Sequence, residues 1–153
     1  MISNTLLILK PDALDRGLVG EITERFILNN FHIVSMNYLI VTEQHIRQHY
    51  APHIEAHGEE IAERILDFFV GRPVLPFIIL GEDAIKRSRK LIGTSDPALS
   101  PSGTIRGDFG DDSYYQADMD KRSCRNLIHG SDSPSEFKRE VKIWFPTYKI
   151  KEQ

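Results

Sequence analysis

The segment Thr5–Leu9 (TLLIL) constrains the fold most strongly, because its apolar residues follow one another without a polar interruption. A strand with one face in water alternates apolar and polar residues, whereas a strand without alternation is covered on both faces. Pro11 lacks the N–H that a sheet ladder needs, so the strand ends at Lys10. The sequence therefore predicts a central strand near the N-terminus, with other elements packed on both of its faces.

The size and composition of the chain fit a single globular domain, which we expect to span residues 1–153. Hydrophobic residues make up 41% and charged residues 27%, so a core can form without disulfides or a structural metal. The one cysteine, Cys124, allows no internal disulfide and fits a reducing compartment. A net charge of −3 predicts neither a nucleic-acid partner nor a membrane-surface partner. Since the sequence contains no signal-peptide core and no membrane span, we expect a cytoplasmic protein.

Apolar spacing and turn residues predict the remaining elements. Those after the first strand are a helix over Leu18–Phe26, a long strand over Phe31–Thr42, a short helix over Glu43–Tyr50 that Pro52 ends, a helix over Glu59–Val70 and a strand over Val74–Leu80. They are followed by a helix over Asp83–Ile92, a mostly long ordered loop over Gly93–Lys121, a strand over Arg125–His129 and a helix that starts at the capping box Ser133–Glu136. This order predicts a ferredoxin-like βαββαβ fold, an α/β (α+β) sandwich in which helices pack on a four-stranded antiparallel sheet.

The corner at residues 126–133 (NLIHGSDS) carries the richest chemistry of the sequence. His129 ends a strand and precedes a helix N-terminus, whose free N–H groups favour a phosphate or a carboxylate. Ser131 and Asp132 add hydrogen-bonding groups, and Glu140 lies in the following helix, where it can orient an imidazole nitrogen. These residues predict a histidine nucleophile or general base directed at an anion. The alternative is a structural histidine beside an ordinary capped helix.

Three basic residues support the prediction that this corner binds an anion. Lys10 ends the first strand, Arg89 lies on a short helix, and Arg106 lies in the Gly-rich segment 103–109 (GTIRGDF). Taken singly, such residues are more often solvated surface charges, but a buried phosphate needs cations and N–H donors around it. The sequence contains neither a GxxxxGK[ST] nor a GxGxxG pattern, so any nucleotide must bind by another route.

The chain resembles the nucleoside diphosphate kinases along nearly its whole length. Three stretches carry the resemblance in the same order: residues 10–20 (KPD, then RGLVG), 101–109 (PSGTIRGDF) and 126–133 (NLIHGSDS), followed by Arg139-Glu140 and Trp144-Phe145. The resemblance implies a ferredoxin-like fold and transfer of the γ-phosphate of a nucleoside triphosphate to a nucleoside diphosphate. It further implies a ping-pong mechanism through a phosphohistidine, low base specificity, and a homo-oligomer that is a tetramer or hexamer built from dimers.

The same resemblance implies roles for individual residues. His129 corresponds to the nucleophilic histidine, supported by Ser131 and Glu140 at the ring and by Tyr50 near the transferred phosphate. The nucleotide-binding residues that it implies are Lys10, Arg89, Ser95, Arg106 and Asn126. It implies Mg²⁺ as the cofactor, held mainly by the nucleotide phosphates and not by protein ligands.

Four positions depart from the family pattern. Ala13 follows the KPD motif where the family usually has glycine, and we expect little effect if the backbone there avoids positive φ. Ser95 replaces the family's threonine, with Thr94 as the neighbouring candidate, and Ile61 falls where the family has a base-stacking phenylalanine. Residues 110–123 contain an insertion. Its acidic residues and its two adjacent tyrosines, at positions 114 and 115, predict a role in assembly or loop ordering, not in chemistry.

Other interpretations of the sequence stay open. Histidines recur every four residues at His45, His49, His53 and His57, a spacing that permits a metal site but also a solvated face or a nucleotide-binding edge. A catalytically silent member of the family would bind nucleotides without transferring phosphate. A ferredoxin-like RNA-binding domain is a weaker alternative, because the predicted central strands lack the aromatic pair that such domains use to stack bases.

Overall fold

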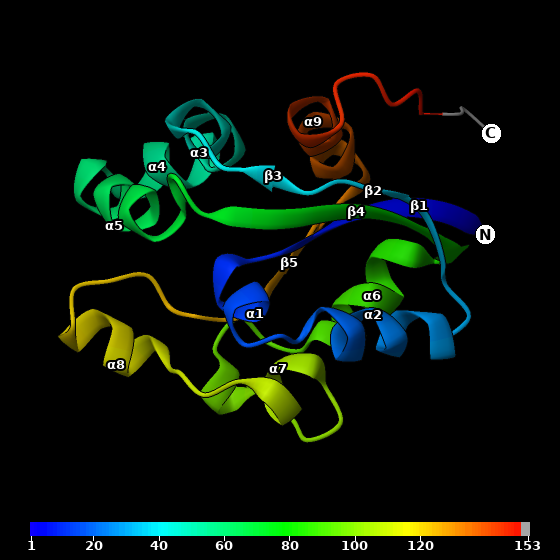
Figure 1. Cartoon of the computed structure of the whole chain (residues 1–153), viewed down its shortest axis with the longest axis horizontal. Helices are drawn as coiled ribbons and strands as arrows, with labels where there is room; N and C mark the ends of the chain where they lie inside the picture. Colours follow the sequence, from blue (N-terminus) through cyan, green and yellow to red (C-terminus); the bar gives the residue numbers. More distant parts are fainter. Residues whose placement is uncertain (151–153) are drawn as a thin grey trace.

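A four-stranded antiparallel sheet with the strand order β2–β4–β1–β5 forms the centre of the molecule (Figure 1). Its strands are β1 (Ile2–Leu9), β2 (His32–Met36), β4 (Pro73–Glu82) and β5 (Ile128–Gly130), and the two-residue strand β3 (Leu39–Ile40) also pairs with β4. This computed structural model describes residues 1–150, so the last three residues of the expected domain 1–153 lie outside the described part. The predicted ferredoxin-like sheet with packed helices is confirmed.

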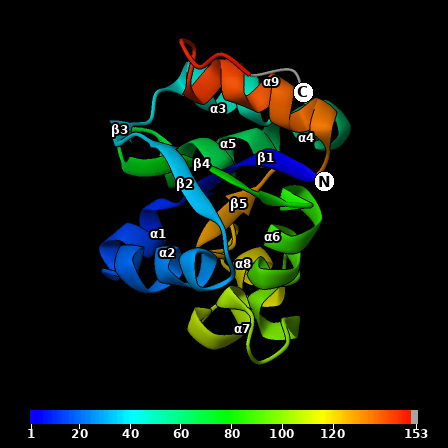
Figure 2. The same ribbon diagram turned by 90° about the vertical axis from the view of Figure 1, so that its right-hand side faces the viewer.

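Helices cover both faces of the sheet, as the apolar run of β1 requires (Figure 2). One face carries α3 (Glu43–His49), α4 (Ala51–His57), α5 (Glu59–Phe69) and α9 (Pro134–Trp144). The other face carries α1 (Pro11–Asp15), α2 (Val19–Leu28) and α6 (Ala84–Ile92), with α7 (Ile105–Phe109) and α8 (Tyr114–Met119) beyond them. Within residues 1–150, no helix has the length and apolar character that crossing a membrane would need.

Successive residues of β1 point alternately into two apolar cores, one on each face of the sheet. Leu7 and Leu9 belong to the core under α2 and α6, and Leu6 and Ile8 belong to the core under α5 and α9. All four are buried, and burying such a side chain contributes roughly 1.5–3 kcal/mol to folding. The prediction that this strand is central and covered on both faces is therefore confirmed.

In the middle of the chain, the observed strands and helices have different bounds from the predicted ones. The single strand predicted over Phe31–Thr42 is wrong, because the chain forms two short strands there and the β2–β4 register shifts between Ile33 and Ser35. The helix predicted over Glu43–Tyr50 is present as α3 and ends before Pro52. Pro52 itself lies in the first turn of the next helix, α4, where a missing N–H costs nothing.

The segment Gly93–Lys121 contains more helical structure than the mostly long loop that the sequence predicts. It contains a 3₁₀ turn at Pro97–Leu99 and the short helices α7 and α8, whose N-terminal N–H groups receive side-chain caps from Thr104 and Ser113. The strand predicted over Arg125–His129 starts only at Ile128, because Leu127 has a φ of 72° and interrupts the extended backbone. Ala13 lies in α1 and is not among the residues with positive φ, as its side chain requires.

Candidate active site

A pocket of about 920 Å³ is lined by residues of α4, α5 and α8 together with residues of the sheet ends. Eight of the nine site residues expected from the sequence line it: His129, Glu140, Tyr50, Lys10, Arg89, Ser95, Arg106 and Asn126. The ninth, Ser131, is fully buried beneath the pocket and contacts Glu140. Segments from both ends of the chain therefore meet here, since β1 and β5 are neighbours in the sheet.

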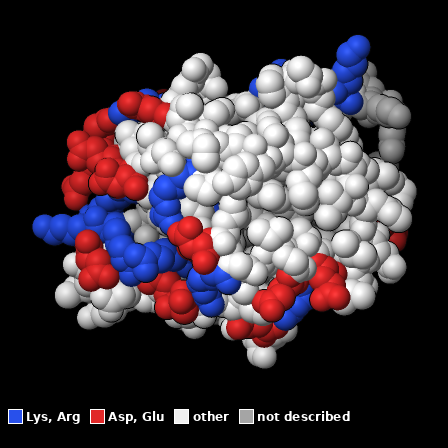
Figure 3. All heavy atoms as spheres, viewed as in Figure 1, with Lys and Arg blue, Asp and Glu red and all other residues white. Residues whose placement is uncertain are grey.

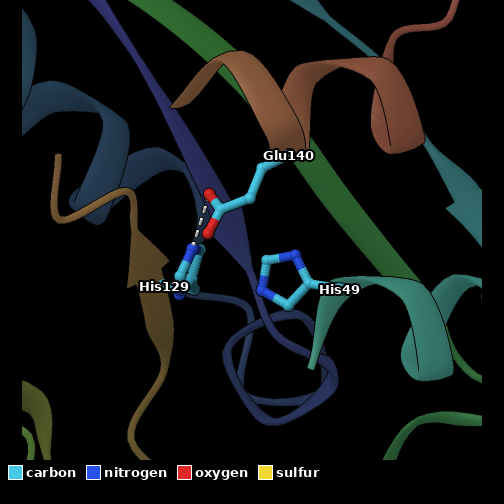
Figure 4. Close-up of side chains that lie close together, drawn as sticks. All are labelled: His49, His129 and Glu140. Carbon is cyan, nitrogen blue, oxygen red and sulfur yellow. Dashed lines mark hydrogen bonds and ion pairs between the residues drawn. The ribbon is translucent and has the colours of Figure 1, made fainter. Parts of the chain in front are cut away.

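His129 is held by Glu140 in one tautomer. Glu140 Oε2 lies 3.0 Å from His129 Nε2 and also accepts a hydrogen bond of 2.6 Å from the Ser131 hydroxyl (Figure 4). A carboxylate oxygen accepts hydrogen bonds, so the imidazole carries its proton on Nε2 and keeps a lone pair on Nδ1. The next residue, Gly130, packs closely against α6, because a Cβ there would lie 2.9 Å from the Ile92 side chain. The arrangement presents an unprotonated ring nitrogen on a rigid strand.

The surroundings of His129 disfavour its charged form. Burial, followed by the charges of Lys10, Arg106 and Arg89 in that order, lowers the pKa of His129 to about 3. Burial also raises the pKa of the Glu140 carboxyl, against which the charge of His49 and the Ser131 hydrogen bond act. At neutral pH the imidazole is therefore a neutral nucleophile and not an imidazolium ion.

Arg106 is fixed by backbone carbonyls. Its Nε donates to the carbonyl of Asn126 at 3.0 Å, and its two terminal nitrogens donate to the carbonyls of Thr94 at 3.1 Å and Ile128 at 2.5 Å. The residue is 8% exposed, and burial lowers its pKa. A guanidinium has five donors, so N–H groups remain for an anion in the pocket. Figure 3 shows Lys and Arg side chains, with Asp and Glu side chains among them, on the surface where α5 and α8 face each other.

Lys10 and Asn126 form a second fixed pair on the pocket wall. Lys10 Nζ donates to Asn126 Oδ1 at 2.7 Å, and Asn126 Nδ2 donates to the carbonyl of Ser95 at 2.9 Å. Burial and then the charge of Arg106 lower the pKa of Lys10 to about 8. Ser95 lines the pocket, whereas the Thr94 hydroxyl bonds within its own turn to Asp96 and Ser100. Ser95 is thus the better placed of the two hydroxyl candidates.

Leu127 holds the start of β5 in a strained conformation. Its N–H donates to Asp12 Oδ2 at 3.0 Å, and its carbonyl accepts the Lys10 N–H at 2.9 Å. A left-handed conformation at a non-glycine residue costs about 1–3 kcal/mol and persists only when the surroundings impose it. Asp12 and Lys10 impose it here, and they turn the chain so that Asn126 and His129 both reach the pocket. The Lys10-Pro11-Asp12 motif therefore shapes the opposite strand as well as the end of its own.

The four regularly spaced histidines do not come together as one metal site. His45 Nδ1 accepts the Thr42 N–H at the start of α3 and stacks on Trp144, while His53 and His57 lie beside each other on α4. His49 accepts the Trp144 indole N–H at 2.9 Å, and its ring meets His129 edge to face at 4.5 Å.

His49, His129 and Glu140 each place one ligand atom within 4.8 Å of the others (Figure 4). Hydrogen bonds to Trp144 and Ser131 already engage this cluster, so we interpret it as support for the His129 ring. Burial lowers the pKa of His49 well below its usual range, so His49 is neutral as well.

The outer part of the pocket is apolar on one side. Ile61 lines it at the position where the resemblance implies an aromatic residue, together with Phe68 on the same helix.

Five residues of the insertion also line the pocket: Tyr114, Ala117, Asp118, Arg122 and Ser123. The sequence predicts instead that the insertion serves assembly or loop ordering and not the chemistry, because its carboxylates are a poor lining for a phosphate pocket. In the structure Asp112 and Asp120 pair with Arg122, and Asp118 pairs with Arg64, so much of that charge is neutralised.

Sequence reasoning missed three contributors to this site. From the sequence, His49 is considered only as one of four regularly spaced histidines that could bind a metal. Asp12 is considered only as part of the motif that ends the first strand. Tyr114 is assigned to an interface. A signal for the first two exists, because His49 precedes Tyr50 and Asp12 lies within the KPD motif. The position of Tyr114 follows from tertiary packing alone.

The chain is similar to proteins of known family over nearly all of its length. A family model for nucleoside diphosphate kinase matches residues 3–150. The nucleoside diphosphate kinase of Heliobacterium modesticaldum is 36% identical over 99% of this chain and 93% of its own. That of Halalkalibacterium halodurans is 37% identical over 99% of this chain and 94% of its own.

Solved structures give the same result. The nucleoside-diphosphate kinase of Borrelia burgdorferi, a transition state mimic with bound vanadate and ADP, superposes with a TM-score of 0.91 at 33% identity, covering 99% of this chain and 93% of that one. The NDP kinase of Pyrobaculum aerophilum superposes with a TM-score of 0.86 at 32% identity, covering 95% and 96%. With its sequence, its fold and its pocket in agreement, the chain belongs to the nucleoside diphosphate kinase family.

Proposed function

We propose that this protein transfers the γ-phosphate of a nucleoside triphosphate to a nucleoside diphosphate through a phosphohistidine at His129. The observation that carries the proposal is the hydrogen bond between His129 Nε2 and Glu140, which leaves Nδ1 unprotonated in a pocket ringed by cations. Membership of the family supports the reaction, and the geometry supports the assignment of the residue.

The reaction proceeds as two half-reactions that use the same groups. The Nδ1 lone pair of His129 attacks the γ-phosphorus, the bond to the β-phosphate oxygen breaks, and the nucleoside diphosphate leaves. A second nucleoside diphosphate then enters, its terminal oxygen takes the phosphoryl group, and His129 regains its lone pair. Lys10, Arg89 and Arg106 stabilise the charge on the phosphoryl oxygens, the main contribution a protein makes to this chemistry. Glu140 stabilises the positive charge that develops on the ring.

The pocket fits a Mg²⁺ ion that arrives on the nucleotide. Most carboxylates among the described lining residues have partners already: Glu140 accepts from Ser131 and His129, Glu136 pairs with Arg139, and Asp118 pairs with Arg64. A cation that retains its waters and binds phosphate oxygens suits such a wall. Mg²⁺ bound in this way neutralises charge on the phosphates, while Lys10 and Arg106 supply the contacts from the protein.

The nucleoside end of the pocket supports low base specificity. Ile61 and Phe68 offer apolar surface there, and apolar contact does not distinguish one base edge from another. We therefore expect similar kcat/KM values for adenine, guanine and pyrimidine diphosphates. A preference above about a hundredfold, or roughly 2.7 kcal/mol, would show that a side chain of the pocket reads a base edge.

Labelling with γ-³²P ATP tests the proposal directly. Wild-type protein is mixed with ATP and Mg²⁺, denatured and separated, and we expect a label that acid removes and base does not, as for a phosphoramidate. The variant His129→Ala should carry no label. His32→Ala is the matched control, because His32 is exposed on β2 and is not among the pocket residues. Nucleotide binding without label on the wild type would instead identify a catalytically silent member of the family.

A further inference from the structure

The inserted helix α8 forms a wall of the nucleotide pocket opposite α5. Two adjacent tyrosines on this helix differ in their surroundings: Tyr114 lines the pocket and is 45% exposed, whereas Tyr115 does not line it and is 75% exposed. Figure 1 shows α5 and α8 in different layers of the molecule, and both helices contribute residues to the pocket lining. Residues from this insertion therefore face any ligand that reaches His129.

The insertion is fixed in place, and is not a loose loop beside the pocket. The Asp112 carboxylate accepts two hydrogen bonds from Arg122, at 2.6 and 3.0 Å, and one from the Arg125 N–H at 2.8 Å. Burial acts to raise the pKa of the Asp112 carboxyl, but Arg122 holds it well below its usual range. On its other side α8 is tied to α5 by an ion pair of 3.2 Å between Asp118 and Arg64, both of which line the pocket.

Tyr114 shares the pocket with the cations of its phosphate end, Lys10 and Arg106. Burial lowers the pKa of Arg106, and Tyr114 is the next largest influence, which acts in the opposite direction. Tyr114 also contributes to the raised pKa of Tyr50, which is due first to burial and then to Glu140. The geometry gives the same neighbourhood, because Tyr114 lines one pocket together with both of these groups and with His129.

We propose that Tyr114 is a nucleotide-binding residue of this protein, whose hydroxyl donates a hydrogen bond to a phosphate oxygen of the bound nucleotide. The inference rests on the proposed function only in taking nucleoside di- and triphosphates as the ligands. A phenol can donate to a phosphate oxygen without adding charge, and hydrogen bonds to charged groups are the stronger kind. The insertion thereby adds a contact to a site that is otherwise built from the common motifs.

Calorimetric titration of the unphosphorylated protein with Mg·ADP tests this contact. Tyr114→Phe removes only the hydroxyl, and we expect its Kd to rise about tenfold or more. Tyr115→Phe makes the same chemical change on the neighbouring residue and should bind Mg·ADP like the wild type. An unchanged Kd in Tyr114→Phe, or equal losses in both variants, would overturn the proposal.

Two further measurements distinguish a contact with the nucleotide from a role of Tyr114 in assembly. Light scattering on Tyr114→Phe should give the wild-type mass, and weaker Mg·ADP binding that accompanies a changed mass would assign the tyrosine to assembly and overturn the proposal. The phosphohistidine label on the wild type tests the proposed function independently. If that label is absent while Tyr114→Phe still weakens Mg·ADP binding, the proposed function fails and the assignment of Tyr114 stands.

Discussion

At the scale of single residues, the site keeps its nucleophile neutral by crowding it with cations and burying it. His129 donates through Nε2 to Glu140, and its low pKa follows from burial and then from Lys10, Arg106 and Arg89. The cations that we propose bind phosphate thus also suppress the imidazolium ion, which could not attack it. Unfolded histidine has a pKa near 6.5, so burial of His129 costs stability progressively as the pH falls from about 6.5 toward 3.

The pKa of Lys10 predicts how activity depends on pH. Burial and Arg106 lower this pKa to about 8, so the protonated, phosphate-binding form is lost as the pH rises through 8. We expect kcat/KM, which reports the free enzyme, to fall above pH 8 and to stay level down to about pH 5, where His129 is still neutral. Lys10→Arg keeps its charge and should lose the alkaline decline. An unchanged decline in that variant would assign the titration to another group.

We expect the substitutions Arg106→Ala and Arg89→Ala to change the free energy of unfolding by different amounts. Arg106 is buried and donates to three carbonyls, and hydrogen bonds to charged groups contribute about 1.5–3 kcal/mol each. Arg106→Ala should lower the free energy of unfolding by about 2 kcal/mol or more in urea titration. Arg89 is exposed with one long bond to Gly130, so Arg89→Ala should change it by less than about 0.5 kcal/mol. Both variants should lose roughly 10²–10³-fold in turnover. Equal stabilities would contradict the structural role of Arg106.

At the scale of elements, β5 starts where Asp12 imposes the conformation of Leu127. Asp12→Ala leaves the buried Leu127 N–H without an acceptor, and we expect a loss of about 1–3 kcal/mol in the free energy of unfolding. Asp12→Asn retains an acceptor oxygen and should lose less. Urea unfolding of both variants measures the difference. Equal losses in Asp12→Asn and Asp12→Ala would show that charge, and not the hydrogen bond, holds this corner.

The elements also show how far sequence reasoning reaches. The central strand, the capped helix α9 and most of the pocket residues could be predicted, because apolar spacing, capping residues and the motifs are local signals. The break between β2 and β3 and the late start of β5 could not, since a register shift at Ile33 and the strained Leu127 depend on partners distant in the sequence. The position of Tyr114 on the pocket wall has the same cause.

At the scale of the whole molecule, β2 leaves one edge of the sheet unpaired within residues 1–150. Exposed apolar side chains gather on this strand and at its ends: Ile27, Leu28, Val34, Met36 and Tyr38. An apolar edge strand is a template for pairing with another chain, and we propose that dimers form through it and build the homo-oligomer implied by the family.

Light scattering tests the role of this edge. We expect the wild type to exceed the 17.5 kDa of one chain and Val34→Lys to shift toward that mass, because a charge on an edge strand opposes pairing. Val70→Lys, at an exposed valine outside this edge, is the matched control. A wild type that is monomeric at all concentrations would refute the proposal.

The ion pair between Arg64 and Asp118 has a consequence for the timing of the cycle. It joins α5 to α8 at the pocket, and each turnover must release a nucleoside diphosphate and later a nucleoside triphosphate past these two walls. Asp118 is 79% exposed, so added salt weakens this surface ion pair. Added salt therefore weakens two interactions at once, the binding of the phosphates and the ion pair that joins α5 to α8. We expect both effects to shorten the residence time of the product nucleotide.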